Sequence, residues 1–77
     1  MPYRLRKLVK VLDEYGIEVE RPRSGSHWKL RAKGRRAYVV PAHNGWKTEI
    51  TDEYIQGLCR HFALERTTIL SKLRGRK

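Results

Sequence analysis

The amino-acid sequence predicts an α+β domain in which a helix is followed by three antiparallel strands and a second helix, with a short extra helix near the C-terminal end. Two observations predict this order. Apolar residues recur at helical spacing towards both ends of the chain, and at every second position in the middle. Two amphipathic helices need an apolar surface, so both are expected to cover one face of the sheet. A chain of 77 residues has room for one such domain, spanning 1–77.

The first helix is predicted from about Pro2 to Tyr15. Its apolar stripe has the spacing i, i+3, i+4 and i+7 and consists of Leu5, Leu8, Val9 and Leu12. Pro2 suits the first turn of a helix, and Gly16 suits the position just after one, where the backbone adopts a positive φ. Gly16 is therefore expected to end this helix.

Basic residues crowd the start of the first helix, and acidic residues lie at its end. The basic residues are Arg4, Arg6 and Lys7, and the acidic ones are Asp13 and Glu14. The helix macrodipole favours the opposite arrangement by about 0.3 to 1 kcal/mol per charge. Two explanations are open: the bases form a phosphate-binding surface, or a solvated face tolerates them.

The middle of the chain alternates between polar and apolar residues, as strands with one buried face do. We predict a first strand over 17–21, a second over 26–32 and a third over 35–40. The short turn at 33–34 favours antiparallel pairing of the second and third strands.

Alternation also predicts which side chains face the helices. Trp28 and Leu30 share the inner face of the second strand, and Tyr38 and Val40 are the expected inner residues of the third. The opposite face of the second strand is expected to carry His27, Lys29 and Arg31. We expect that face to be open to solvent.

The second helix is predicted over 52–63, after a loop that carries Trp46 and Lys47. Thr51 is a favourable N-cap, and the acidic residues that follow it suit the first turn of a helix. Helical spacing recurs at Ile55, Leu58, Cys59 and Phe62. A short third helix over 67–73 is expected to add its apolar side to the core, and the basic tail 74–77 is expected to fray.

The charge of the chain indicates a polyanionic partner. A formal net charge of +10 exceeds what solubility requires, which favours nucleic acid first and an acidic protein or anionic membrane next. A generically basic surface is the alternative. The single cysteine, Cys59, excludes an internal disulfide. No apolar run approaches the roughly 18 residues of a membrane span, so we expect a cytoplasmic protein without membrane contact.

The most informative stretch of the sequence lies between Glu20 and Glu49, where no carboxylate occurs but eight lysines and arginines do. Within it, Gly25-Ser26-His27 opens the second strand. The segment Val39-Val40-Pro41-Ala42-His43 closes the third strand. A histidine is thereby placed on a basic strand face.

These residues suggest a family. Gly25-Ser26-His27, Gly34 in the turn, the Val-Pro-x-His strand end and the Ile55-Gln56-Gly57-Leu58 helix resemble the HicA toxins of bacterial and archaeal toxin–antitoxin pairs. The resemblance covers about 5–73. It departs from the family at Trp28, where members often have a second histidine or similar residue. It also departs over 50–53, because family members often have Lys-Gly-Thr-Leu where this chain has acidic residues that would repel RNA.

The resemblance implies a fold, an activity and a partner. The implied fold is that of a double-stranded-RNA-binding domain (dsRBD). The implied activity is that of an mRNA interferase, a cofactor-free and metal-independent endoribonuclease that cleaves mRNA with a single catalytic histidine. The resemblance assigns that role to His27 and implies inhibition by a HicB-like antitoxin. We expect such an antitoxin to bury His27, to present carboxylates over Lys29, Arg31 and Arg36, and to use an apolar anchor at Trp46.

The residue chemistry agrees with this activity. Metal-independent RNA cleavage uses the 2′-hydroxyl as nucleophile and needs a base, an acid and positive charge near the phosphorane. An imidazole serves either proton role near neutral pH, and neighbouring cations favour the neutral form that acts as a base. His27 is thus the expected base, with Lys29 and Arg31 nearest. The candidate RNA-binding and phosphate-binding residues are Ser26, Lys29, Arg31, Arg36, Arg4, Lys7 and Lys47.

The roles of other aromatic and polar residues have alternatives. His43 is either a second acid or base, an orienter of His27, or a loop residue that caps by hydrogen bonding. Trp46 stacks on an unpaired base, contacts the antitoxin or packs on its own domain. His61 and Cys59 are two residues apart on a helix and do not face each other, so no metal site is expected and Cys59 is assigned to the core.

Three functions are therefore compatible with the sequence. The first is the ribonuclease toxin. The second is a non-catalytic RNA-binding module that reads the shape of an A-form helix, with an incidental histidine. The third is an adaptor whose cations bind an acidic protein.

Overall fold

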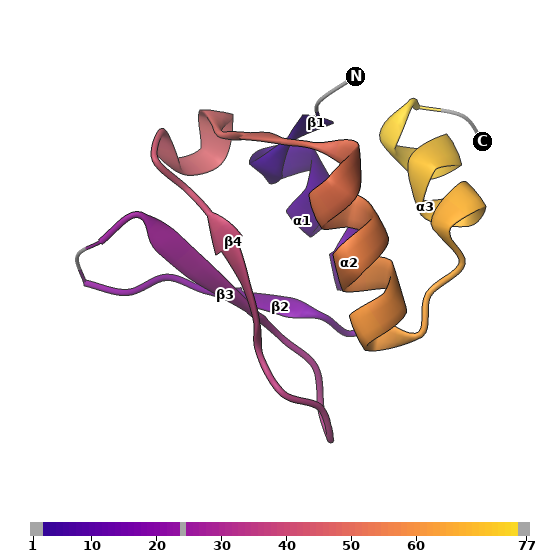
Figure 1. Ribbon diagram of the computed structural model, residues 1–77, viewed down its shortest axis with the longest axis horizontal. Coiled ribbons are helices and arrows are strands. Elements are labelled where there is room, and N and C mark those ends of the chain that lie inside the picture. Colours follow the sequence, from indigo (N-terminus) through magenta and orange to yellow (C-terminus); the bar gives the residue numbers. More distant parts are fainter. Residues whose placement is uncertain (1–2, 24, 76–77) are drawn as a thin grey trace.

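A computed structural model describes residues 3–23 and 25–75 and shows the predicted α+β order, with two short strands added (Figure 1). The helical elements are α1 (Leu5–Asp13), the 3₁₀ turn η1 (Gly45–Lys47), α2 (Asp52–Phe62) and α3 (Arg66–Leu73). The strands are β1 (Tyr3–Arg4), β2 (Glu18–Glu20), β3 (His27–Arg31), β4 (Tyr38–Pro41) and β5 (Glu49–Ile50). In Figure 1, α1 and α2 lie on the same side of the sheet formed by β2, β3 and β4.

The first helix begins later than predicted. Tyr3 and Arg4 form β1, which pairs antiparallel with β5 in the register Tyr3↔Ile50 and Arg4↔Glu49. The backbone N–H of Leu5 donates to the carbonyl of Thr48 at 2.7 Å, so the chain stays extended until Leu5. Pro2, predicted in the first turn, lies outside the described residues. The β1–β5 pair is a non-local contact that helical spacing does not encode.

The end of α1 follows the prediction. Gly16 has a φ of +75°, and its N–H bonds to the carbonyl of Asp13 while the N–H of Ile17 bonds to that of Leu12. These two bonds form a Schellman motif, which needs a residue without Cβ at its left-handed position. Ile17 and Leu12 are both buried, which adds the usual apolar contact across the motif.

The three-stranded sheet has the order β2-β3-β4 with antiparallel neighbours. Trp28 and Leu30 are buried and His27 is exposed, as strand alternation predicts. Val40 is buried and Tyr38 is half-buried, which confirms the inner face of β4. The third strand begins at Tyr38 and not at position 35, because the two preceding arginines contact the end of α2.

Those contacts join the β3–β4 hairpin to α2. The guanidinium of Arg35 donates to the carbonyl of His61 at 2.8 Å, and the Nε2 of His61 bonds to the carbonyl of Arg36 at 2.7 Å. The backbone over 35–37 therefore leaves the strand ladder and turns towards the helix. His61 thus holds the hairpin to α2.

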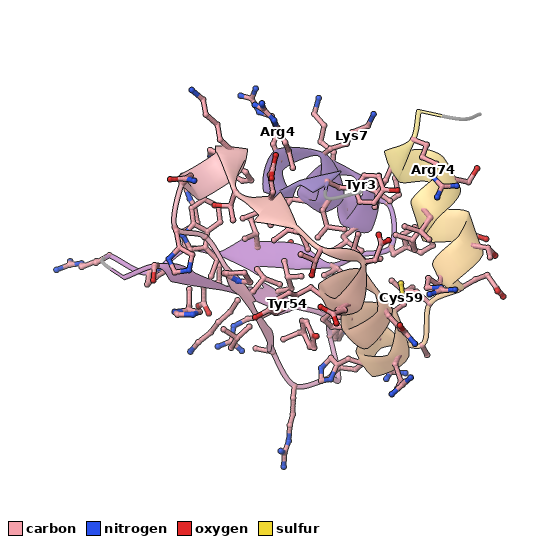
Figure 2. The ribbon with its side chains drawn as sticks, turned by 45° about the horizontal axis from the view of Figure 1, so that its top comes forward. Tyr3, Arg4, Lys7, Tyr54, Cys59 and Arg74 are labelled. Atoms are coloured by element: carbon pink, nitrogen blue, oxygen red, sulfur yellow. The ribbon has the colours of Figure 1, made fainter. Side chains whose placement is uncertain are left out.

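The remaining helices match the predicted segments closely. Thr51 precedes α2 at the N-cap position, although its side chain forms no capping hydrogen bond. The helix ends at Phe62, followed by Ala63 in the left-handed conformation with a φ of +57°. After α3, the Nε of Arg74 donates to the hydroxyl of Tyr3 at 3.3 Å (Figure 2), and the predicted tail residues 76–77 lie outside the described residues.

One hydrophobic core joins all the elements. Its fully buried large side chains are Leu5, Leu8, Leu12, Leu30, Val40, Ile50, Ile55, Leu58 and Ile69. Figure 2 shows the sulfur of Cys59 between α2 and α3, where the residue is 3% exposed, so its assignment to the core is confirmed. Burial raises the pKa of the Cys59 thiol, which keeps this cysteine protonated and unreactive near neutral pH.

Candidate nucleic-acid interface

His27 is the first residue of β3 and projects to the open face of the sheet. Its neighbour Trp28 points to the core, so strand alternation turns the imidazole outward. Gly25, with a φ of +105°, allows the backbone to turn into the strand, a conformation that a residue with a Cβ rarely adopts. The half-buried Ser26 accepts a hydrogen bond at its carbonyl from the N–H of Ala42 at 2.6 Å.

His43 lies beside His27. The two imidazole centroids are 5.8 Å apart with an interplanar angle of 72°. The strands set this distance, because His27 pairs with Pro41 and the Ser26–Ala42 hydrogen bond continues the alignment past the end of β4. The structure therefore brings together two imidazoles from segments 16 positions apart.

The imidazole of His27 opens onto a shallow groove of about 270 Å³, which we call the histidine groove. Its lining residues are Glu20, Arg21, Pro22, His27, Lys29 and Arg31. Lys29 and Arg31 lie two and four residues after His27, so all three side chains share one face of β3. A phosphate bound in this groove would lie next to an imidazole and between cations.

One cation of the histidine groove already has a partner. The Nε of Arg31 donates to a carboxylate oxygen of Glu20 at 2.6 Å, in an ion pair whose two side chains are about half exposed. The hydrogen bond from Arg31 and its charge lower the pKa of Glu20 below its ordinary value, so the carboxylate is ionised at neutral pH. The sequence alone did not predict that Glu20 lies in this groove. The β2–β3 register brings it there by placing Glu20 opposite Lys29, on the face of the sheet that also carries Arg31.

A second groove, of about 480 Å³, lies where β1 and α1 meet η1, and we call it the tryptophan groove. Its lining residues are Arg4, Arg6, Asn44, Trp46 and Lys47. The β1–β5 pair brings the start of α1 against the loop that follows β4. Two of the predicted phosphate-binding residues, Arg4 and Lys47, thus come together although 43 positions separate them.

Aromatic and cationic contacts connect the two grooves. Trp46 packs edge-on against Trp28 with ring centroids 4.9 Å apart. The guanidinium carbon of Arg21 lies 5.5 Å from the Trp46 ring and 5.7 Å from the Trp28 ring, within cation–π range. Arg21 also lines the histidine groove, so a single side chain contacts both that groove and the Trp46 ring of the tryptophan groove. Trp46 is half-buried and packs on its own domain, with part of the ring left accessible.

Three predicted phosphate-binding residues line neither groove: Ser26, Arg36 and Lys7. Arg36 belongs to the β3–β4 hairpin turn, at the opposite end of β3 from His27. Figure 2 shows Lys7 and Arg4 extending from the start of α1, but Lys7 does not line the tryptophan groove. The ammonium of Lys7 lies near Gly75 instead: a Cβ added to Gly75 would be 3.7 Å from the Lys7 Nζ.

The described residues contain no group of three or more histidine, cysteine, aspartate or glutamate side chains arranged to hold a metal ion. His61 bonds to the hairpin backbone, and Cys59 is buried. Within the same residues, no helix has the length and apolar character needed to cross a bilayer.

No protein-family model, curated protein or solved structure shows significant similarity to this chain. The resemblance to HicA toxins therefore rests on the residues quoted above.

Proposed function

We propose that this protein is a metal-independent endoribonuclease that cleaves mRNA, and that it is the toxin of a HicA-like toxin–antitoxin pair. One observation carries the proposal: the imidazole of His27 lines an exposed groove together with Arg21 and Lys29, and the imidazole of His43 lies 5.8 Å from that of His27. Paired imidazoles beside cations meet the chemical needs of phosphodiester transesterification, which are a base, an acid and positive charge.

The proposed reaction assigns a role to each group. Neutral His27 takes the proton of the ribose 2′-hydroxyl, and the oxygen attacks the adjacent phosphorus. Protonated His43 gives its proton to the departing 5′-oxygen, so the products are a 2′,3′-cyclic phosphate and a 5′-hydroxyl. Lys29 and Arg21 stabilise the charge that develops on the phosphorane. No cofactor takes part.

The order helix, three strands, helix, with both long helices on one sheet face, supports the comparison with the dsRBD fold. In the proposed pair, a HicB-like antitoxin covers the histidine groove with carboxylates. Lys29 and Arg21 are the cations it would contact most directly, because Arg31 already binds Glu20 and Arg36 lies at the far end of the hairpin. The proposed contact surface of the antitoxin therefore differs from the one expected from the sequence, which consisted of Lys29, Arg31 and Arg36.

The test is RNA cleavage by purified protein in the presence of EDTA. His27→Ala should lower the cleavage rate by about 100-fold or more, the usual contribution of a general base, while RNA affinity and the unfolding midpoint stay unchanged. His61→Gln is the matched control: it also removes a histidine but keeps an N–H donor for the carbonyl of Arg36. It should cleave at the wild-type rate.

The outcomes separate the candidate functions. Equal cleavage by wild type and His27→Ala would contradict the proposed mechanism. If the wild-type protein binds RNA but does not cleave it, the non-catalytic RNA-binding module would be the function that remains. A growth test in which induced wild type arrests cells and His27→Ala does not would support the toxin assignment.

A further inference from the structure

The tryptophan groove holds unpaired cations. Arg4, Arg6 and Lys47 line it, and none of them forms an ion pair with a carboxylate among the described residues. Glu49 is the strand partner of Arg4 but makes no such pair. Arg31 in the other groove differs, since Glu20 neutralises it. The tryptophan groove therefore presents its positive charge to solvent.

The composition of this groove matches one kind of ligand. Arginine forks and a lysine ammonium bind phosphate oxygens, whereas an indole provides a surface on which a nucleobase stacks. Asn44 adds an amide with both donors and acceptors for a base edge. The volume of about 480 Å³ lies within the range of small-ligand sites. A nucleotide combines the required anion and aromatic ring.

The position of the groove relates it to the histidine pair. Asn44 directly follows His43, whose ring lies against His27. Arg21 borders the histidine groove and also contacts Trp46. Asn44 and Arg21 thus place the tryptophan groove next to the histidine pair.

We propose that the tryptophan groove is a subsite for a nucleotide of single-stranded RNA next to the cleaved bond. The base packs against Trp46, and its phosphate binds Arg4, Arg6 and Lys47. Bases inside a duplex are stacked and paired and cannot reach the indole, so the substrate class is unpaired RNA. The position of the subsite next to the cleaved bond rests on the proposed function. Binding of a nucleotide in the groove does not rest on it.

Binding is tested with a short 2′-O-methyl RNA, which lacks the nucleophile and stays intact. Arg6→Gln should weaken binding of the single strand by about threefold to tenfold near 0.1 M salt and reduce the log–log salt slope by about 0.7, as expected for one lost phosphate contact. Lys10→Gln is the matched control, because it removes the same charge from an exposed position of α1 outside both grooves. It should leave affinity nearly unchanged.

Trp46→Leu keeps an apolar side chain against Trp28 but removes the stacking surface. It should weaken single-strand binding by about tenfold, within the usual effect of a lost base–aromatic contact. The same RNA annealed to its complement should bind more weakly than the single strand and should be insensitive to Trp46→Leu. Thermal unfolding of each variant checks that the fold is retained.

Several results would overturn the subsite. One is that Arg6→Gln and Lys10→Gln weaken single-strand binding equally, and another is that the duplex binds more tightly than the single strand. A third is that binding of a polyaspartate peptide depends on Arg6 and Trp46 while binding of RNA does not.

Failure of the subsite is distinguishable from failure of the nuclease. If His27→Ala abolishes cleavage but Arg6→Gln and Trp46→Leu bind single-stranded RNA normally, only the subsite is wrong. If they lose binding while His27→Ala cleaves normally, only the catalytic assignment is wrong.

Discussion

Single residues in this protein acquire their roles from partners that lie far away in the sequence. Glu20 is an example: it lies at the edge of the carboxylate-free stretch, yet the strand register brings it to Arg31 at 2.6 Å. The ion pair lowers the positive charge of the histidine groove and leaves Lys29 as its free cation on β3. Glu20 thus competes with any phosphate for Arg31.

Removing this competition should strengthen RNA binding. We predict that Glu20→Gln raises the affinity for single-stranded RNA by about two- to fivefold at neutral pH, the factor that corresponds to an exposed ion pair. Fluorescence anisotropy with 2′-O-methyl RNA measures it.

Asp13→Asn is the matched control for this prediction. It changes the net charge by the same amount at the exposed end of α1, outside both grooves. An equal gain in both variants would show that overall charge, and not release of Arg31, determines affinity.

At the scale of elements, the docking of α2 on the sheet depends on a close approach. Gly57 lies in α2 against the ring of Tyr38 from β4, and a Cβ at this position would overlap the Tyr38 hydroxyl. Tyr38 is itself held by Phe62 and His61, whose rings lie 6.4 and 5.4 Å from it. The glycine is therefore needed for packing and not for backbone conformation.

This contact gives a stability prediction. Gly57→Ala should destabilise the protein by about 1–3 kcal/mol, as overpacking does, although alanine favours a helix over glycine by about 1 kcal/mol. Urea denaturation measures the change.

Gln56→Ala, at the neighbouring exposed position of α2, is the control and should have little effect. Adding Tyr38→Phe to Gly57→Ala removes the overlapping oxygen and should restore most of the lost stability. Persistent loss in the double variant would contradict the proposed clash.

At the scale of the whole molecule, positive charge collects on a path that joins the two grooves. The path carries Arg21 and Lys29 at the histidine groove and Arg4, Arg6 and Lys47 at the tryptophan groove. Glu20 lies beside this path at the histidine groove, where it is bound to Arg31, and Glu14 binds Lys72 at 2.7 Å outside both grooves. Long-range attraction should therefore guide a polyanion to this path.

The path predicts how RNA affinity depends on salt. Five unpaired cations that each bind one phosphate of a single strand give a log–log slope of about −3.5. Affinity measured over a series of potassium chloride concentrations provides the slope. A slope near zero would favour the adaptor function, in which the cations contact a protein surface.

Local patterns in the sequence were sufficient to predict most of the fold. Helical and alternating spacing located α1, α2, α3 and the three-stranded sheet, and predicted that His27 faces outward while Trp28 faces the core. These features depend on the periodicity of side chains along a single element, which neighbouring residues encode.

Tertiary structure alone decided how the site is assembled. The approach of His43 to His27, the pairing of Glu20 with Arg31 and the β1–β5 contact that forms the tryptophan groove all join residues distant in sequence. Each depends on strand register and on which segments pair. Periodicity within an element carries no information about either, because a helix or strand keeps the same local pattern whatever its partner.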